Sequence, residues 1–218
     1  MLFFTLYLVH NTKYGNMIIF LYGEDDFRSR QKLLQIKEKF STGDPAGSGL
    51  SVFDFEEGNF KIKPLDVLGT PNLLSPKRLV ILKNLIGSGE ETAQKEMLEY
   101  LNKHNYLEGN EDLVVVFFEG DRPKKNSSLF KTLEKNSKSQ NSEKLSAIKL
   151  SQWTLKRIKE LDPAASISNS ALEKLAAYSG GDTQALNSEI QKLISFSPDK
   201  MIEESDVDEI VSANFNLN

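Results

Sequence analysis

Short apolar runs alternate with amphipathic stretches from Met17 to Leu150, and this alternation restricts the chain to few fold classes. Several runs, such as Val114–Phe118, are apolar without interruption, which is typical of strands buried on both faces of a parallel sheet. The predicted strands are Ile18–Tyr22, Leu50–Phe55, Arg78–Lys83, Leu113–Phe118 and Ala147–Leu150. Between them, helical spacing as in Ala93, Met97 and Leu101 predicts covering helices. We therefore expect an α/β fold, a doubly wound parallel five-stranded sheet with helices on both faces.

Only helical patterns follow Leu150. The clearest is the amphipathic stripe of Leu186, Ile190, Leu193 and Ile194. The capping box Ser170-x-x-Glu173 predicts where one of these helices begins, and Ser205-x-x-Asp208 precedes a short last helix that carries Val207, Ile210 and Val211. We expect an α/β domain over residues 17–150 and a small all-α lid domain over 151–218, and we interpret the polar stretch 136–144 as a loop.

Residues 1–16 are interpreted as a non-structural extension, because Met17 starts the first convincing element. A targeting peptide is the alternative, although the apolar run Met1–His10 is too short to span a bilayer and lacks a basic region before it. We expect a cytoplasmic protein without membrane contact.

Composition excludes several kinds of site. The chain has no cysteine and two histidines, His10 and His104, which excludes thiol catalysis and argues against a histidine metal site or a Ser/His/Asp triad. A formal charge of -4 argues against nucleic-acid binding by bulk charge. We expect no metal and no cofactor.

The turn after the first predicted strand, Gly23-Glu24-Asp25-Asp26-Phe27, stands where a nucleotide-binding protein keeps its phosphate loop. A working loop needs several glycines, a lysine and a serine or threonine, whereas this turn has one glycine and three carboxylates that would repel a triphosphate. Metal binding by the three acids is the alternative, but adjacent carboxylates cannot all face one ion. Capping of the following helix by Asp25 or Asp26 is the simpler interpretation.

A nucleotide-binding scaffold followed by a small helical domain is the arrangement of AAA+ modules. Besides the phosphate loop, this sequence lacks other groups that an active AAA+ module needs. The strand Leu79–Leu82 ends in Lys83-Asn84-Leu85, without the acids that hold magnesium-bound water. Gly181-Asp182 is not followed by the arginine of an active lid, and a Ser-Arg-Cys motif is absent because there is no cysteine. We therefore predict no ATP hydrolysis and interpret Gly23, Glu24, Asp25 and Asp26 as a degenerate nucleotide site.

Four segments carry a resemblance to a known family. They are Leu21-Tyr22-Gly23-Glu24-Asp25-Asp26-Phe27, the stretch from Leu73 to Asn84 with its apolar pair, Ser and Lys-Arg, the pair Gln152-Trp153, and Gly181-Asp182 followed by Leu186-x-x-Glu189-Ile190-x-Lys192-Leu193. In their order and spacing the chain resembles the delta subunit of the bacterial DNA polymerase III clamp loader. That family carries a further helical collar domain after the lid, whereas this sequence ends at Asn218.

The resemblance implies a non-catalytic subunit in DNA replication. Such a subunit binds the sliding clamp (beta) and helps to open it for loading onto primed DNA. Its other partners would be the ATPase subunits and delta prime, with DNA contacted weakly or indirectly, and DNA polymerase (nucleotidyltransferase) activity would belong to the holoenzyme. The alternatives are a divergent phosphotransferase and a DNA-binding or scaffold module.

The resemblance places the clamp contact at Leu73 and Leu74. Family members often have an aromatic residue at the second position, and Leu74 would fill the same apolar pocket with less buried area. Pro71 and Pro76 flank the pair and favour a presented loop. The alternative is that both leucines are core residues that lead into the next strand.

A basic segment offers a second candidate contact. Residues 121–144 contain seven basic and three acidic residues, and Lys124 and Lys125 are the candidate DNA contacts. The alternative is a solvated surface without a ligand.

Overall fold

A computed structural model describes residues 17–70, 77–104, 112–120, 123, 125–198 and 200–211. The chain divides into two compact units, Met1–Ser142 and Glu143–Asn218. Each unit is described by itself.

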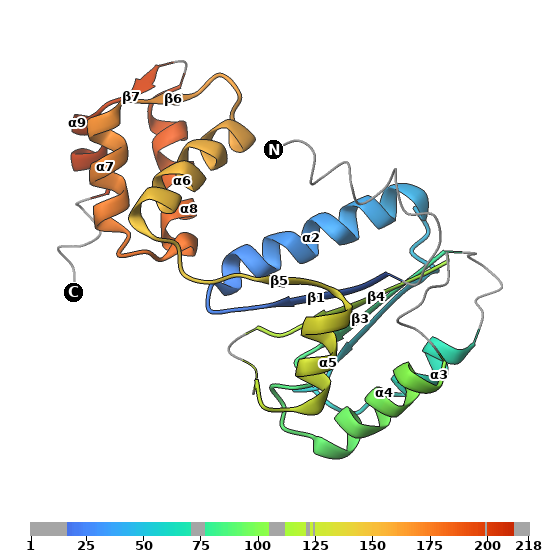
Figure 1. Cartoon of the computed structure of the whole chain (residues 1–218). Coiled ribbons are helices and arrows are strands. Elements are labelled where there is room, and N and C mark those ends of the chain that lie inside the picture. Colours follow the sequence, from blue (N-terminus) through green and yellow to red (C-terminus); the bar gives the residue numbers. More distant parts are fainter. Residues whose placement is uncertain are drawn as a thin grey trace. The chain divides into compact units, whose positions relative to one another are not determined.

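A parallel five-stranded sheet forms the centre of the first unit (Figure 1). Its strands are β1 (Met17–Tyr22), β2 (Leu50–Asp54), β3 (Arg78–Lys83), β4 (Leu113–Phe118) and β5 (Lys138–Asn141). They lie in the order β2-β3-β4-β1-β5, with β1 between the two strands that come last in the sequence. The predicted doubly wound parallel sheet is confirmed, and all five carboxyl ends lie at one edge.

Helices cover both faces of this sheet (Figure 1). Helix α2 (Asp26–Gly43) covers one face, and α3 (Pro64–Gly69), α4 (Glu91–Lys103) and α5 (Ser128–Asn136) cover the other. Strand β1 shows how the sequence achieves this, because Ile19 and Leu21 pack with the α2 side. Phe20 and Tyr22 pack on the opposite side, as the alternation of side chains along a strand requires.

The fifth strand was predicted in the wrong place. Residues 147–150 are the first turn of α6 (Ala147–Leu161), and β5 lies in the polar stretch that was interpreted as a loop. Within the described residues, β5 pairs with β1 alone. Lys138 and Ser139 are exposed, so this edge strand has no apolar run that would reveal it in the sequence. Leu150 belongs instead to a buried helical stripe with Thr154 and Ile158. Helix α6 therefore crosses the expected domain boundary at 150, and the second unit begins at Glu143.

The second unit contains α6, α7 (Asn169–Tyr178), α8 (Thr183–Phe196) and α9 (Glu204–Ile210). Two parallel two-residue strands, β6 (Ser166–Ile167) and β7 (Met201–Ile202), add to the helices that the sequence predicted. Its core is made of buried aliphatic residues from all four helices: Leu150, Ile158, Leu175, Leu186, Ile190, Leu193 and Val207. Among the described residues, no helix is long and apolar enough to cross a membrane.

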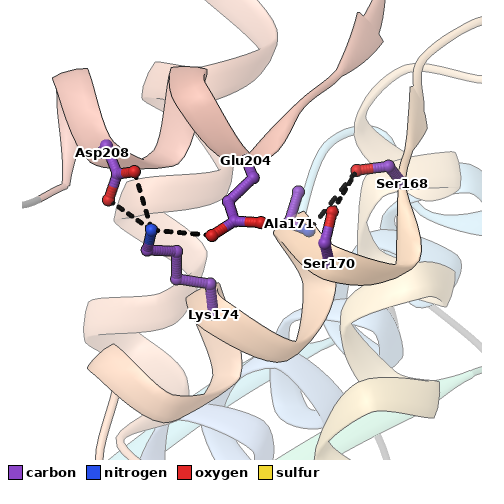
Figure 2. A network of polar contacts seen from close by, with 6 residues as sticks. All are labelled: Ser168, Ser170, Ala171, Lys174, Glu204 and Asp208. Atoms are coloured by element: carbon purple, nitrogen blue, oxygen red, sulfur yellow. Dashed lines mark hydrogen bonds and ion pairs between the residues drawn. The ribbon is translucent and has the colours of Figure 1, made fainter.

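The helix starts expected at Ser170 and Ser205 are wrong by two residues. Ser168 is the N-cap of α7, and its hydroxyl accepts a hydrogen bond from the Ala171 N–H. Glu203 caps α9 in a reciprocal capping box with Asp206. The two helices are joined on the surface by Lys174, which binds Glu204 and Asp208 (Figure 2).

Candidate functional site at the carboxyl edge of the sheet

The turn after β1 is covered by backbone that follows β5. Gly23 has a φ of 130°, and a Cβ atom there would lie 2.5 Å from the backbone nitrogen of Ser142. The Ser142 N–H donates to the Tyr22 carbonyl at 2.7 Å, and the Asp25 N–H donates to the Ser142 carbonyl at 2.8 Å. In a phosphate loop such backbone N–H groups face the nucleotide. Here the Asp25 N–H is already engaged within the unit.

A carboxylate of the protein itself caps the helix that follows this turn. Asp25 is 7% exposed, and its side chain accepts a hydrogen bond of 3.1 Å from the Arg28 N–H at the start of α2. The same carboxylate contacts the Arg28 guanidinium at 3.2 Å, and Asp26 pairs with Arg30 at 2.7 Å. Of the two acids that the sequence offered as caps, Asp25 is the one that binds the helix start. Its negative charge lies where the helix dipole would otherwise favour a phosphate.

The ends of β2 and β3 are held together by polar side chains. The Lys83 ammonium lies 3.1 Å from Asp54 Oδ2, and the Asn84 amide donates to Asp54 Oδ1 at 3.1 Å. Burial alone would raise the pKa of Asp54, but hydrogen bonds from Lys83, Glu56 and Asn84 and the charge of Lys83 outweigh it and lower the pKa. Lys83 and Asn84 stand where an active module would need acids for magnesium, and both are tied to β2.

Glu119, directly after β4, is the most perturbed group of this edge. It is 1% exposed, and its two carboxylate oxygens accept the N–H groups of Ile86 and Gly87, each at 2.9 Å. Burial raises the pKa of Glu119 to about 7, the two N–H groups oppose this, and the nearby charges of Glu56 and Asp54 add to it. Sequence reasoning missed this residue. An acid that directly follows the uninterrupted apolar run 114–118 was the available signal.

The remaining candidate residues are not brought into this edge. Leu73, Leu74 and Lys124 lie outside the described residues, and Lys125 is exposed three residues before α5. In the described part of the chain, no cluster of His, Asp or Glu side chains could hold a metal ion.

Comparison with known proteins decides the family. The sequence profile of the DNA polymerase III delta subunit matches residues 19–142, which is more than half of the chain. The chain belongs to the DNA polymerase III delta subunit family. The matched region ends at Ser142, where the first unit of this delta-family chain also ends.

Solved structures show that the fold of this delta-family chain is AAA+-like. The Bacillus subtilis DNA clamp loader delta protein is similar with a TM-score of 0.56 and 19% identity, over 91% of this chain. Domain III of the Thermotoga maritima replication initiation protein DnaA is similar with a TM-score of 0.52 and 14% identity, over 94% of this chain and 86% of that domain. The chain spans 58% of the length of the Bacillus protein. No curated protein sequence matches it.

Proposed function

We propose that this chain is a clamp-loader subunit of DNA replication that binds the sliding clamp and helps to open it, without hydrolysing ATP. Family membership supports the clamp-loader role. The observation that supports the absence of ATP chemistry is the carboxyl edge of the sheet, where the protein's own groups bind the turn and the helix start that a nucleotide would need. Ser142 covers the turn, Asp25 caps α2, and Lys83 is bound to Asp54.

Titration calorimetry with ATP and magnesium tests this part of the proposal. We expect no heat of binding at millimolar ATP, because the capping carboxylate of Asp25 repels phosphate and the Asp25 N–H already has an acceptor. Micromolar affinity, or measurable turnover, would overturn the proposal and favour the divergent phosphotransferase.

The clamp contact is proposed at Leu73 and Leu74. An apolar pair in a loop is a suitable anchor for a pocket on a partner. Binding would help to open the ring if the subunit has higher affinity for a clamp with a distorted interface, because ligands shift populations toward the state they prefer. The ATPase subunits and delta prime would supply the hydrolysis that releases the clamp.

The double variant Leu73→Asp, Leu74→Asp tests this contact in a pull-down with purified sliding clamp. We expect clamp binding to be abolished while the far-UV circular dichroism spectrum is kept. Leu34→Asp is the matched control, since Leu34 on α2 is 54% exposed and a charge there costs no core packing. Retained clamp binding by the double variant would refute the proposed contact, and unfolding of the variant would favour core positions for the two leucines.

A weak DNA contact is proposed at Lys124 and Lys125. Exposure of Lys125 supports it, and a lysine that binds phosphate releases counterions. Lys124→Glu with Lys125→Glu should reduce the salt dependence of DNA binding by the assembled loader. An unchanged salt slope would assign these lysines to the solvated surface. Strong duplex binding by the chain alone, with no clamp contact, would favour the scaffold alternative.

A further inference from the structure

Glu119 joins the end of β4 to the turn between β3 and α4. Each of its two oxygens accepts one backbone N–H of that turn, from Ile86 and from Gly87. The turn contacts the end of β4 twice more, because the Asn84 N–H donates to the Phe118 carbonyl at 2.8 Å and the Gly120 N–H donates to Asn84 Oδ1 at 3.3 Å. A buried carboxyl group therefore helps to set where α4 begins.

No positive charge compensates this carboxyl group in the described part of the chain. Glu119 forms no ion pair there, and Lys83, at the end of β3, is paired with Asp54. The other charged groups around it are acids: Asp54 and Glu56 at the end of β2, and Asp26 at the start of α2, whose Oδ1 lies near Gly120. Burying an ionised carboxylate without a cation is costly, so the folded turn favours the protonated form.

The end of this turn, at Gly89, borders a surface groove. The groove has a volume of about 590 Å³ and lies between the start of α4 and the start of α5. Gly89, Glu91 and Gln94 line it on the α4 side, and Asn126, Ser127 and Ser128 line it on the α5 side. Gly89 has a φ of 77° and Asn84 a φ of 57°, so both ends of the turn adopt left-handed backbone conformations, and Glu119 binds the N–H groups of Ile86 and Gly87 between them.

We propose that Glu119 is a protonation-controlled latch on the β3–α4 turn. Protonated, it remains buried, and its carbonyl oxygen still accepts a backbone N–H of the turn, which keeps the turn closed. Ionised, it favours an open turn in which the carboxylate reaches water and the α4 wall of the groove is released. The latch is independent of clamp binding and of ATP, and it makes the shape of the α4–α5 groove depend on pH.

The direction follows from linkage. A carboxyl group that holds its proton more tightly in the closed turn stabilises that turn fully below its ordinary pKa of 4.5, and this stabilisation is lost as the pH rises to about 7. Full hydration in the open turn would change the closed-to-open ratio by about two orders of magnitude across that range.

Amide hydrogen exchange on the full chain tests the latch. Protection of the Ile86 and Gly87 amides, corrected for the intrinsic pH dependence of exchange, should fall at least about tenfold between pH 5 and pH 8. In Glu119→Gln the protection should not change with pH, whereas the control Glu38→Gln, an exposed carboxyl on α2, should behave as the wild type. Constant protection in the wild type, or an equal fall in Glu119→Gln, would overturn the proposal.

A second measurement does not need a folded variant. Carbon NMR of the Glu119 carboxyl group in the wild-type chain should give a titration midpoint near 7, and the amide signals of Ile86 and Gly87 should move with the same midpoint. A midpoint near the ordinary value of 4.5 would refute the latch.

Discussion

Replacing Gly23 by alanine tests whether the turn after β1 is packed closely against the backbone of Ser142. The new Cβ would lie 2.5–2.6 Å from three backbone atoms of Ser142. Backbone atoms cannot move away by rotating a side chain, so the end of β5 must shift. That shift would break the bonds of Ser142 to Tyr22 and to Asp25. We therefore expect a large loss of stability in the first unit.

The size of the loss can be worked out from these contacts. A φ of 130° costs an L-residue about 1–3 kcal/mol. The two hydrogen bonds contribute about 1 kcal/mol each. The sum, about 3–5 kcal/mol, is a large part of the 5–15 kcal/mol by which a typical domain is stable.

Urea unfolding measures this loss. Far-UV circular dichroism follows both units, while fluorescence of Trp153, the single tryptophan, follows the second unit. Gly43→Ala is the matched control, because Gly43 ends α2 with no atom within 4 Å of the added Cβ, and it should be neutral or stabilise by up to about 1 kcal/mol. If Gly23→Ala unfolded at the same urea concentration as the wild type, the close contact with Ser142 would be refuted.

Two further substitutions test the polar contacts. Asp25→Ala removes the N-cap of α2 and should lower the free energy of unfolding by about 1 kcal/mol; a neutral result in urea unfolding would show that the cap is not needed. Lys174→Met removes both contacts with α9 (Figure 2) and should lower the melting temperature slightly at low salt, with the difference vanishing in 1 M salt; a loss that persists in salt would point to packing instead. Hydrogen bonds to the carboxylates of Asp208 and Glu204 raise the pKa of Lys174. The contribution of these contacts to stability should therefore be complete below the ordinary pKa of 10.5 and disappear only in more alkaline solution.

The sequence predicted those parts of the fold that depend on local patterns. Four strands were found. The apolar runs of β1, β3 and β4 are buried on both faces of the sheet, as Val116 and Phe117 show by packing on opposite faces. The fifth was missed because β5 is an edge strand that needs no apolar residue, and the first apolar turn of α6 was mistaken for it. The start of α7 was displaced because Ser168 and Ser170 both suit an N-cap, and only the backbone decides between them.

The candidate site was predictable in composition but not in geometry. Three carboxylates after β1 were enough to argue against a triphosphate, and Asp25 as a cap follows from local helix chemistry. The cover by Ser142 is a contact between segments far apart in the sequence, so no local pattern announces it. In the sequence Glu119 resembles an ordinary surface acid, and only its position directly after the buried strand β4 makes it a buried group. The proposed clamp contact at Leu73 and Leu74 is based on the family resemblance.

The position of β1 in the sheet also bears on how the chain becomes a folded protein. Strand β1 is the first to be synthesised, yet its two neighbours, β4 and β5, are the last strands of the unit. A nascent chain must therefore keep the apolar β1 without a partner until roughly ninety further residues, up to the start of β4, have been made. Such long-range pairing is slow, and an exposed apolar strand is prone to aggregate. The first unit can therefore close only after Ser142, which covers the turn after β1, has left the ribosome.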